Sequence, residues 1–264
     1  MHRLPLMSPM VSVVVPSYND AAMLRRCLAA LAAQTRPADE IVVVDNGSSD
    51  STVDVAIAYG ARVVTELRRG IPQATSAGFD AARGDILGRL DADSVPPVDW
   101  VERLVDAFER EPELEVLSGP GLFYGGHPFV HWFAERVQMS LYETLIGFVL
   151  GHDVLYGSNL ALRASTWRDL RHRVHRDDNT VHDDLDFAIN LEPGTGVRYD
   201  PSFTVGVSAR PFADWARYSR TVRMAFGTLA LNHREESLWE RKRAWQIALA
   251  GNPDEDGEAI RATR

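Results

Sequence analysis

The stretch GDILGRLDADSVPP, residues 84–97, decides the fold of this chain. Residues 85–90 form a short, largely apolar run, and Asp91 and Asp93 follow it directly. Further apolar runs of strand length lie at residues 11–15, 41–44, 62–64 and 114–117. Helical patterns separate them at residues 21–34, 50–59, 70–83 and 99–110. Apolar strands that alternate with helices predict an α/β fold, with a mostly parallel central sheet covered by helices on both faces.

Polar residues follow each of the first four predicted strands. They are PSYND at residues 16–20, DNGSSD at 45–50, ELRRG at 66–70 and DAD at 91–93. Parallel strands end at one edge of a sheet, and ligands of such sheets bind beyond the carboxyl ends of the strands. The sequence therefore predicts a site built from these four loops.

Asp91 and Asp93 are the strongest candidates for metal binding. Because alternate residues of an extended chain point the same way, both carboxylates can face one cleft. Carboxylate oxygens are the ligands that Mg²⁺ and Mn²⁺ prefer, and such ions are often shared with substrate phosphates. The alternative interpretation is a solvated turn that caps the following helix.

Length and composition exclude several classes of protein. The 264 residues are 45% hydrophobic and 25% charged, which are ordinary values for one large globular domain. The net charge of −9 argues against nonspecific binding of nucleic acid. Cys27 is the single cysteine, so no intramolecular disulfide can form. The chain shows no leader-like or membrane-spanning run, which predicts a cytoplasmic protein, or one held at the inner face of the cell membrane.

Four motifs, in this order and at this spacing, resemble those of the family 2 glycosyltransferases. They are VVVPSYN at residues 13–19, VVVDNGSSDST at 42–52, GDI at 84–86 and LDAD at 90–93. The resemblance is close over residues 10–120 and extends weakly to about residue 210. It implies a GT-A fold, a nucleoside-diphosphate sugar donor (UDP- or GDP-linked) and a divalent metal, Mn²⁺ or Mg²⁺.

The resemblance also implies roles for residues of these motifs. Asp93 would coordinate the metal that bridges the diphosphate, and Asp91 would lie near both the ribose and the metal. Asp45 would accept a hydrogen bond from the base. The residues that would line the nucleotide pocket are Pro16, Tyr18 and Asn19. Simpler interpretations compete: Pro16 could end a strand, Tyr18 could pack in the core, and Asp45 could form a turn.

The predicted third helix departs from the pattern of the family. Many relatives carry an Arg-Asn pair where this chain has Thr75 and Ser76. Arg89 stands two residues before Asp91 on the same strand face, so it could supply the missing grip on the diphosphate. A surface arginine with no such role is the competing interpretation.

A second acidic cluster, HDDLDF at residues 182–187, resembles the Glu-Asp motif that lines the acceptor cleft in the family. Asp184 aligns best with the general base of inverting members, which takes the proton of the acceptor hydroxyl. Asp183 is the alternative base and a candidate acceptor contact. A carboxylate at a helix N-terminus is also stabilising by itself. Asn190 stands where relatives often have arginine, a further departure.

The stretch GSN, residues 157–159, resembles a glycine-asparagine segment that faces the donor and acceptor sugars. Asn159 could therefore hydrogen-bond a sugar hydroxyl. A turn before a strand is the competing interpretation.

The resemblance divides the chain into five expected segments. They are a tail at residues 1–9, a nucleotide-sugar-binding half at 10–120, an acceptor-binding half at 121–210, a helical segment at 211–250 and a polar tail at 251–264. Residues 119–126 are expected to form a glycine-rich loop. The apolar, aromatic residues 127–150 could contact a lipid acceptor or a membrane, or be buried in the core. The arginine-bearing residues 217–223 could contact an anionic acceptor or lipid, or remain a solvated basic face.

The leading hypothesis is a metal-dependent, inverting glycosyltransferase that acts on a sugar, lipid or small-molecule acceptor, such as a cell-envelope glycan precursor. A non-catalytic module that binds sugar nucleotides or a partner is the alternative, because the pattern departs at Thr75, Ser76 and Asn190. A sugar-1-phosphate nucleotidyltransferase fits less well. Residues 16–19 are not the glycine-rich basic loop that such enzymes carry.

Overall fold

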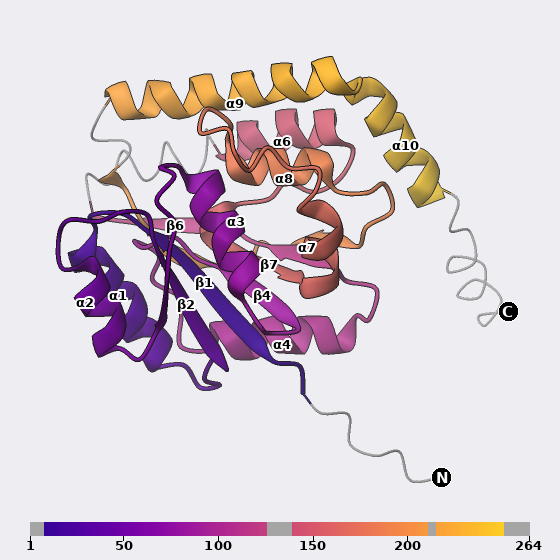
Figure 1. Ribbon diagram of the computed structural model, residues 1–264. Helices are drawn as coiled ribbons and strands as arrows, with labels where there is room; N and C mark the ends of the chain where they lie inside the picture. The colour runs from indigo at the N-terminus through magenta and orange to yellow at the C-terminus, as the bar shows by residue number, and fades with distance from the viewer. Residues whose placement is uncertain (1–7, 126–138, 211–214, 251–264) are drawn as a thin grey trace, which may run out of the picture.

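The computed structural model describes residues 8–125, 139–210 and 215–250 (Figure 1). Most of the predicted N-terminal tail, the predicted C-terminal tail and the first part of the 127–150 segment lie outside these residues. Through residue 118 the chain alternates strand and helix, as predicted. The elements are β1 (Val11–Ser17), α1 (Ala21–Ala32), β2 (Glu40–Asp45), α2 (Thr52–Ala58), β3 (Arg62–Thr65), α3 (Ile71–Ala81), β4 (Ile86–Arg89), α4 (Trp100–Arg110) and β5 (Val116–Ser118).

The second half has shorter strands and more helix. Its elements are β6 (Gly121–Tyr124), α6 (Met139–Leu150), η2 (Gly157–Asn159), β7 (Leu160–Arg163), α7 (Ala164–Leu170), α8 (Asp183–Asn190), β8 (Val197–Tyr199), β9 (Val205–Ser208), α9 (Trp215–Glu235) and α10 (Leu238–Ala250). In Figure 1, α9 runs along the outer edge of the molecule, and α6 and α8 lie between it and the sheet.

The central sheet has the strand order β3-β2-β1-β4-β7-β5-β8. Strands β1 to β4 pair in parallel, whereas β7 runs antiparallel to both of its neighbours, β4 and β5. Within this register Ser17 of β1 lies opposite Asp45 of β2. The loops after these strands therefore leave the sheet at the same edge. A separate pair, β6 and β9, is parallel.

The valines of β1 explain why helices cover both faces of the sheet. Val13 and Val15 join a buried cluster with α1 and α4, whereas Val14, with the opposite side-chain direction, joins a second cluster with α3. Trp100 and Phe79, both nearly inaccessible to solvent, anchor these two clusters. A strand that is apolar on both sides must be covered by other elements on both faces of the sheet. The apolar runs in the sequence therefore predicted helices on both faces.

Several local predictions from the sequence are wrong. Residues 121–124 of the predicted glycine-rich loop form β6, and Pro16 does not end its strand, because it pairs with Val44 inside β1. The helix α7 was not predicted. By contrast, the predicted helical character of residues 211–250 is confirmed over the described residues 215–250, which form α9 and α10.

A buried polar network attaches α9 to the body of the protein. Asp186 of α8 is 1% exposed, and its carboxylate accepts hydrogen bonds from Asn190, from Asn232 of α9 and from the backbone N–H of His175. The His175 ring contacts Asp186 at 2.7 Å and Glu235 of α9 at 3.1 Å. Burial alone would lower the pKa of His175, but these two carboxylates outweigh it and raise the pKa above its ordinary value.

We expect His175 to make stability depend on pH. The pKa of His175 is higher in the folded protein than in the unfolded chain, where it is about 6.5. Its contribution to the free energy of unfolding is therefore complete below pH 6.5, and it is lost as the pH rises through the pKa of the folded protein. The midpoint of urea unfolding, measured at intervals from pH 5.5 to 8.5, should fall with pH more in the wild type than in His175→Gln. Equal slopes for the two proteins would contradict this account. Since His172 shows no hydrogen bond or ion pair in the described structure, His172→Gln is the matched control.

Candidate functional site

Hydrogen bonds join the loops after β1 and β2 into one wall, residues 18–20 and 45–50, at the edge of the sheet. Asn19 adopts a positive φ of 47°, and its side-chain oxygen accepts a hydrogen bond from the backbone N–H of Ser49 at 2.7 Å. The backbone N–H of Asn19 donates to the hydroxyl of Ser48 at 3.0 Å. One oxygen of Asp45 accepts from the backbone N–H of Ser48 at 3.0 Å. Asn19 and Asp45 thus shape the two loops, and Asp45 forms the local turn that its sequence context indicated.

Tyr18 stands on this wall with its ring available to a ligand. Its side chain is well exposed, with a relative accessibility of 42%, so packing in the core is excluded. The guanidinium of Arg69, from the loop after β3, stacks 3.1 Å from the centre of the ring. This arrangement places an aromatic face and a cation together where the carboxyl ends of the strands predict a ligand.

Arg89, at the end of β4, connects two carboxylates from distant parts of the chain. Its guanidinium lies 2.9 Å from Asp91 and 3.2 Å from Asp183, the first residue of α8. Only 4% of its side chain is exposed, so it is neither the surface arginine nor the open diphosphate ligand considered from the sequence. Asp183 also accepts a hydrogen bond from the Thr75 hydroxyl at 3.1 Å. Arg89 therefore positions the acidic residues of the site.

Asp93 has a different cationic partner. Arg210, which follows β9, contacts Asp93 at 3.1 Å and Asp20 at 2.6 Å. Desolvation raises the pKa of Asp93, and Arg210 opposes this shift. Desolvation also raises the pKa of Asp91, to about 6, against the effect of Arg89. Both carboxylates are thus partly desolvated and have cations as neighbours.

The start of α8 holds a tight group of titratable side chains. One oxygen of Asp184 contacts His182 Nδ1, and the other accepts from the backbone N–H of Gly157 at 2.9 Å. Burial would raise the pKa of Asp184, but His182 and the Gly157 N–H outweigh it and lower the pKa to about 2. Burial would lower the pKa of His182, but Asp184 raises it to about 9. At neutral pH the two form an ion pair.

Two groups of residues have the donor atoms that a divalent cation requires. Asp91 and Asp93 offer carboxylate oxygens on side chains that are 41% and 20% exposed, which suits a hard cation shared with a phosphate ligand. His182, Asp183 and Asp184 each have one donor atom within 4.8 Å of the others. The first group is more open to a donor-bound cation, because Asp183 and Asp184 are buried and accept hydrogen bonds from Thr75 and from the Gly157 N–H.

Asn159 does not face the site. It is fully buried, its side-chain oxygen accepts from Trp100 Nε1 at 2.9 Å, and its side-chain N–H₂ donates to the carbonyl of Phe203. The predicted contact of this amide with a sugar hydroxyl is therefore wrong, and the turn interpretation is correct. Its neighbour Gly157 is the residue of this segment that contacts the site, through Asp184.

Sequence reasoning missed three contributors to the site. Thr75 was noted as a departure from the family, but its hydrogen bond to Asp183 was not foreseen. The ion pair of His182 with Asp184 and that of Arg210 with Asp93 were also missed. The adjacency of His182 to the acidic cluster was a usable signal. Nothing in the sequence links Arg210 to Asp93, which lies 117 positions earlier.

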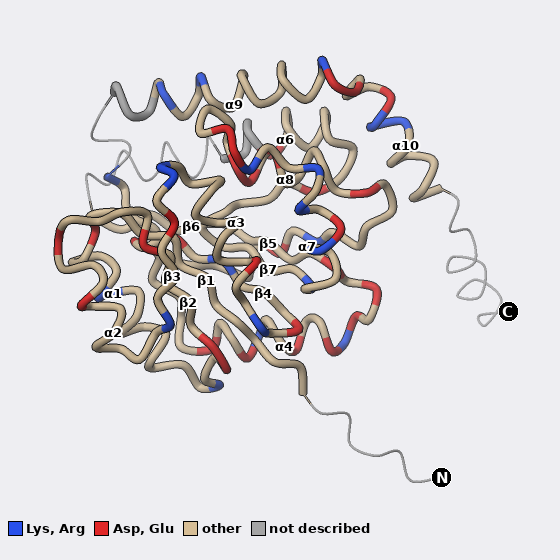
Figure 2. The backbone as a smooth tube through the Cα atoms, viewed as in Figure 1, with Lys and Arg blue, Asp and Glu red and all other residues tan. Residues whose placement is uncertain are grey.

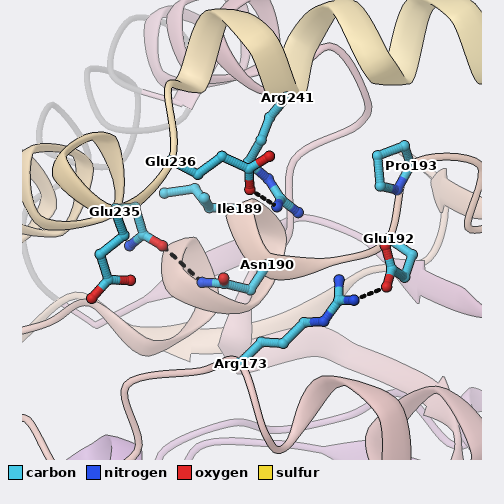
Figure 3. Close-up of a pocket in the computed structure, with 9 residues that line it drawn as sticks. Arg173, Ile189, Asn190, Glu192, Pro193, Glu235, Glu236 and Arg241 are labelled. Atoms are coloured by element: carbon cyan, nitrogen blue, oxygen red, sulfur yellow. Dashed lines mark hydrogen bonds and ion pairs between the residues drawn. The ribbon is translucent and has the colours of Figure 1, made fainter.

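A cavity of about 500 Å³ beside α8, α9 and α10 lies apart from these carboxylates (Figure 3). Its charged walls are already paired: Arg173 contacts Glu192, and Arg241 contacts Glu236. Asn190, the second departure from the family pattern, lies here and donates to Asn232 at 2.8 Å. This cavity offers no unpaired cation or carboxylate cluster comparable to the site at the edge of the sheet.

None of the described helices combines the length and apolar character needed to cross a bilayer.

Comparisons with solved structures agree on the fold. Glucosyl-3-phosphoglycerate synthase from Mycobacterium tuberculosis, in complex with Mn²⁺ and UDP-glucose, superposes with a TM-score of 0.61 at 22% identity, over 88% of this chain and 84% of that one. The mannosyltransferase PcManGT from Pyrobaculum calidifontis, in complex with GDP-mannose and Mn²⁺, gives 0.58 at 19% identity, over 98% and 80%. The predicted GT-A fold is confirmed.

Sequence comparisons identify the family. Glycosyltransferase AglE of Haloferax volcanii is 36% identical over 103 residues, 36% of this chain and 34% of the relative. Chondroitin synthase of Pasteurella multocida is 32% identical over 118 residues, 43% of this chain and 12% of the relative. The match thus spans about a third or less of these relatives. The model of glycosyl transferase family 2 matches residues 12–159, and that of glycosyl transferase family group 2 matches residues 89–252. Because the first model alone spans more than half of the sequence, the chain belongs to glycosyl transferase family 2.

Proposed function

We propose that this chain is a metal-dependent, inverting glycosyltransferase that moves a sugar from a UDP- or GDP-linked donor to an acceptor hydroxyl. One observation carries the proposal. Arg89 holds Asp91, from the end of β4, and Asp183, from the start of α8, within 3.2 Å of one guanidinium nitrogen. The carboxylates that we assign to the donor side and the acceptor side thereby meet at one guanidinium group. The fold neighbours crystallised with Mn²⁺ and UDP-glucose or GDP-mannose support this class of donor.

On the donor side, Asp91 and Asp93 would hold Mn²⁺ or Mg²⁺. The cation, when bound, offsets the negative charge that develops on the nucleoside-diphosphate leaving group. Tyr18 offers its exposed ring to the nucleotide, with Pro16 and the loop shaped by Asn19 and Asp45 around it. The proposed donor half is residues 10–120.

On the acceptor side, a carboxylate must take the proton of the attacking hydroxyl. We assign this role to Asp184, which stays ionised at working pH because His182 and the Gly157 N–H stabilise its charge. Asp183, whose second oxygen has no hydrogen bond within the described structure, is the alternative base and an acceptor contact. The proposed acceptor half is residues 121–210, and the acceptor is a sugar, a lipid or a small molecule such as a cell-envelope glycan precursor.

The competing proposal is a non-catalytic module that binds a sugar nucleotide or a partner protein. It is disfavoured because Thr75, one of the departures from the family, orients Asp183 instead of leaving it unsupported. A binding module has no use for an oriented carboxylate pair at its acceptor side. Release of nucleoside diphosphate from a bound donor, in the presence of an acceptor, separates the two.

Donor binding should be visible as a metal-dependent shift in melting temperature. A ligand at about 100 times its Kd stabilises the native state by about 2.7 kcal/mol, which raises the melting temperature of a chain of this size by roughly 5–10 °C. We expect this with Mn²⁺ and one nucleoside diphosphate or its sugar, and not with either alone. Asp93→Asn should remove the shift, because it removes a charged ligand of the cation.

Asp106→Asn, on the exposed surface of α4, is the matched control and should keep the full shift. A metal-dependent shift that survives in Asp93→Asn but disappears in Asp183→Asn would move the cation to the group at the start of α8. No shift with any nucleotide at millimolar concentration would argue against the donor site altogether.

We also propose that the protein works in the cytoplasm at the inner face of the cell membrane. This rests on the arginine-bearing residues 217–223, for which the sequence predicted contact with an anionic acceptor or lipid.

A further inference from the structure

Half of the strongly exposed large apolar side chains of the described structure belong to three helices. On α6 they are Leu145 and Phe148, on α9 Val222 and Phe226, and on α10 Trp239, Ile247 and Leu249. α6 and α10 pack against each other, and α9 packs on α8. In Figure 1, α9 and α10 form the outer rim on the side of the molecule away from α4. We call the solvent-facing side of α9 and α10 the rim face.

The exposed side of α9 mixes cationic and apolar residues. Thr228 and Asn232, which are 0% and 4% exposed, mark the side that is packed against α8. Arg223, Phe226 and Arg234 lie on the opposite side, because residues 3, 8 or 11 positions apart share one face of an α-helix. With 21 residues, α9 is about 31 Å long and presents this face as a straight stripe.

An aromatic cluster continues the rim face at the start of α10. Phe148 of α6 and Trp239 of α10 meet edge to face, 6.3 Å apart between ring centres. Lys242 lies with its ammonium 3.2 Å from the centre of the Phe148 ring. Both rings are more than half exposed. Arg243 and Ile247 follow Trp239 at helical spacing on the exposed side of α10.

The charge of this segment is opposite to that of the whole chain. Residues 215–250 contain seven basic and three acidic side chains, whereas the chain contains 28 and 37. Figure 2 shows the basic residues along α9 and at the start of α10, with acidic residues gathered around the turn between the helices. Within the described part of the chain, no carboxylate pairs with Arg220, Arg223, Arg234 or Arg243. All four side chains are exposed.

From these observations we propose that the rim face docks on an anionic lipid bilayer. The rim face carries both apolar and cationic side chains. Such a surface suits the headgroup region of a bilayer, where aromatic rings can enter the edge of the acyl-chain layer and arginines can contact lipid phosphates. Arg210, which contacts Asp93 of the site, lies five residues before the start of α9 in the sequence. This inference rests on the membrane location proposed above and identifies the rim face as the surface that contacts the membrane.

Vesicle binding of the full chain, without donor or metal, tests the inference. We expect the protein to float with vesicles of phosphatidylcholine that contain about 30% phosphatidylglycerol, and not with phosphatidylcholine alone. Raising NaCl from about 0.1 to 0.5 M should weaken binding, because salt screens exposed charge. Arg223→Gln with Arg234→Gln should lower the partition coefficient about 25-fold, at about fivefold for each basic residue near an anionic surface. Phe226→Ser with Trp239→Ser should lower it at least about tenfold.

Matched controls carry the same substitutions elsewhere on the surface. They are Arg25→Gln with Arg83→Gln, and Ile57→Ser with Val98→Ser, and both should bind as the wild type does. All these sites are exposed, and circular dichroism should show native folds. Equal binding to neutral vesicles, no binding to anionic ones, or equal losses in the controls would each overturn the inference. Light scattering could also overturn the inference. If it showed that the wild type is a dimer and that the rim-face variants are monomers, a second copy of the chain would occupy this face. Because no donor is present, failure here is distinct from failure of the proposed sugar transfer.

Discussion

Asp184→Asn is expected to lower the rate of sugar transfer by roughly 10³-fold while leaving donor binding unchanged. A positioned general base contributes about 10² to 10⁴ in rate, and the amide cannot accept a proton. The amide oxygen can still accept from the Gly157 N–H, and its N–H₂ can donate to a neutral His182, so the local structure should persist. The measurement is release of nucleoside diphosphate with the donor found by thermal shift, in parallel with the thermal shift itself.

Asp183→Asn is the comparison that identifies the base. Asp183 accepts from Thr75 and pairs with Arg89, so its amide variant should disturb donor binding as well as transfer. If Asp183→Asn loses transfer with donor binding intact, and Asp184→Asn transfers at the wild-type rate, the base is Asp183. Wild-type transfer in both variants would contradict an acidic base at the start of α8.

Arg89→Met should destabilise the protein by about 3–5 kcal/mol. Removing one partner of a buried ion pair leaves uncompensated charge, and here both Asp183 and Asp91 would lose their counter-ion. Methionine has a similar length and fills the same space, so loss of charge is the main effect. The measurement is the free energy of unfolding in urea. Arg110→Met is the matched control: its pair with Asp106 is exposed, and the change should be within about 0.5 kcal/mol.

Gly157→Ala tests the same contact from the other side. An added Cβ would lie 1.3 Å from Arg89 Nη1 and 2.6 Å from its Cζ, so the guanidinium must leave its carboxylates. We expect a loss of stability and of donor binding together. Gly227→Ala, in α9, meets no atom within 4 Å and should instead stabilise by about 1 kcal/mol through helix propensity. Wild-type stability in both Arg89→Met and Gly157→Ala would show that the buried pairs contribute little.

The first half of the fold was predictable because each strand there is apolar on both sides and each helix has a clear period. Residues 11–15 are apolar at four of five positions, which predicted burial on both faces, and in the structure their valines enter two separate clusters. β6 was not predicted, because a four-residue strand next to glycines is too short to show a pattern of alternating apolar residues. The antiparallel direction of β7 was not predicted, because strand direction is set by the path of the connecting chain and not by composition.

The candidate site divides in the same way. Asp45, Asp91 and Asp93 follow predicted strands directly, so the sequence placed them at one edge of the sheet. Asn159 was misassigned because the same amide serves equally well in a buried network, and burial depends on Trp100 and Phe203. Arg89 was expected to contact phosphate, but the fold surrounds it with carboxylates and leaves it 4% exposed.

By itself the sequence determined the family, the mostly parallel sheet and the edge at which acidic residues gather, because local periodicity and short motifs encode these features. Only the tertiary structure decided which cation meets which carboxylate: Arg89 with Asp91 and Asp183, and Arg210 with Asp93. It also decided that Arg220, Arg223 and Arg234 of α9 are exposed, with no carboxylate partner among the described residues. Ion pairs and exposure depend on distances between residues that are far apart in the chain, and those distances exist only after the helices have packed on the sheet.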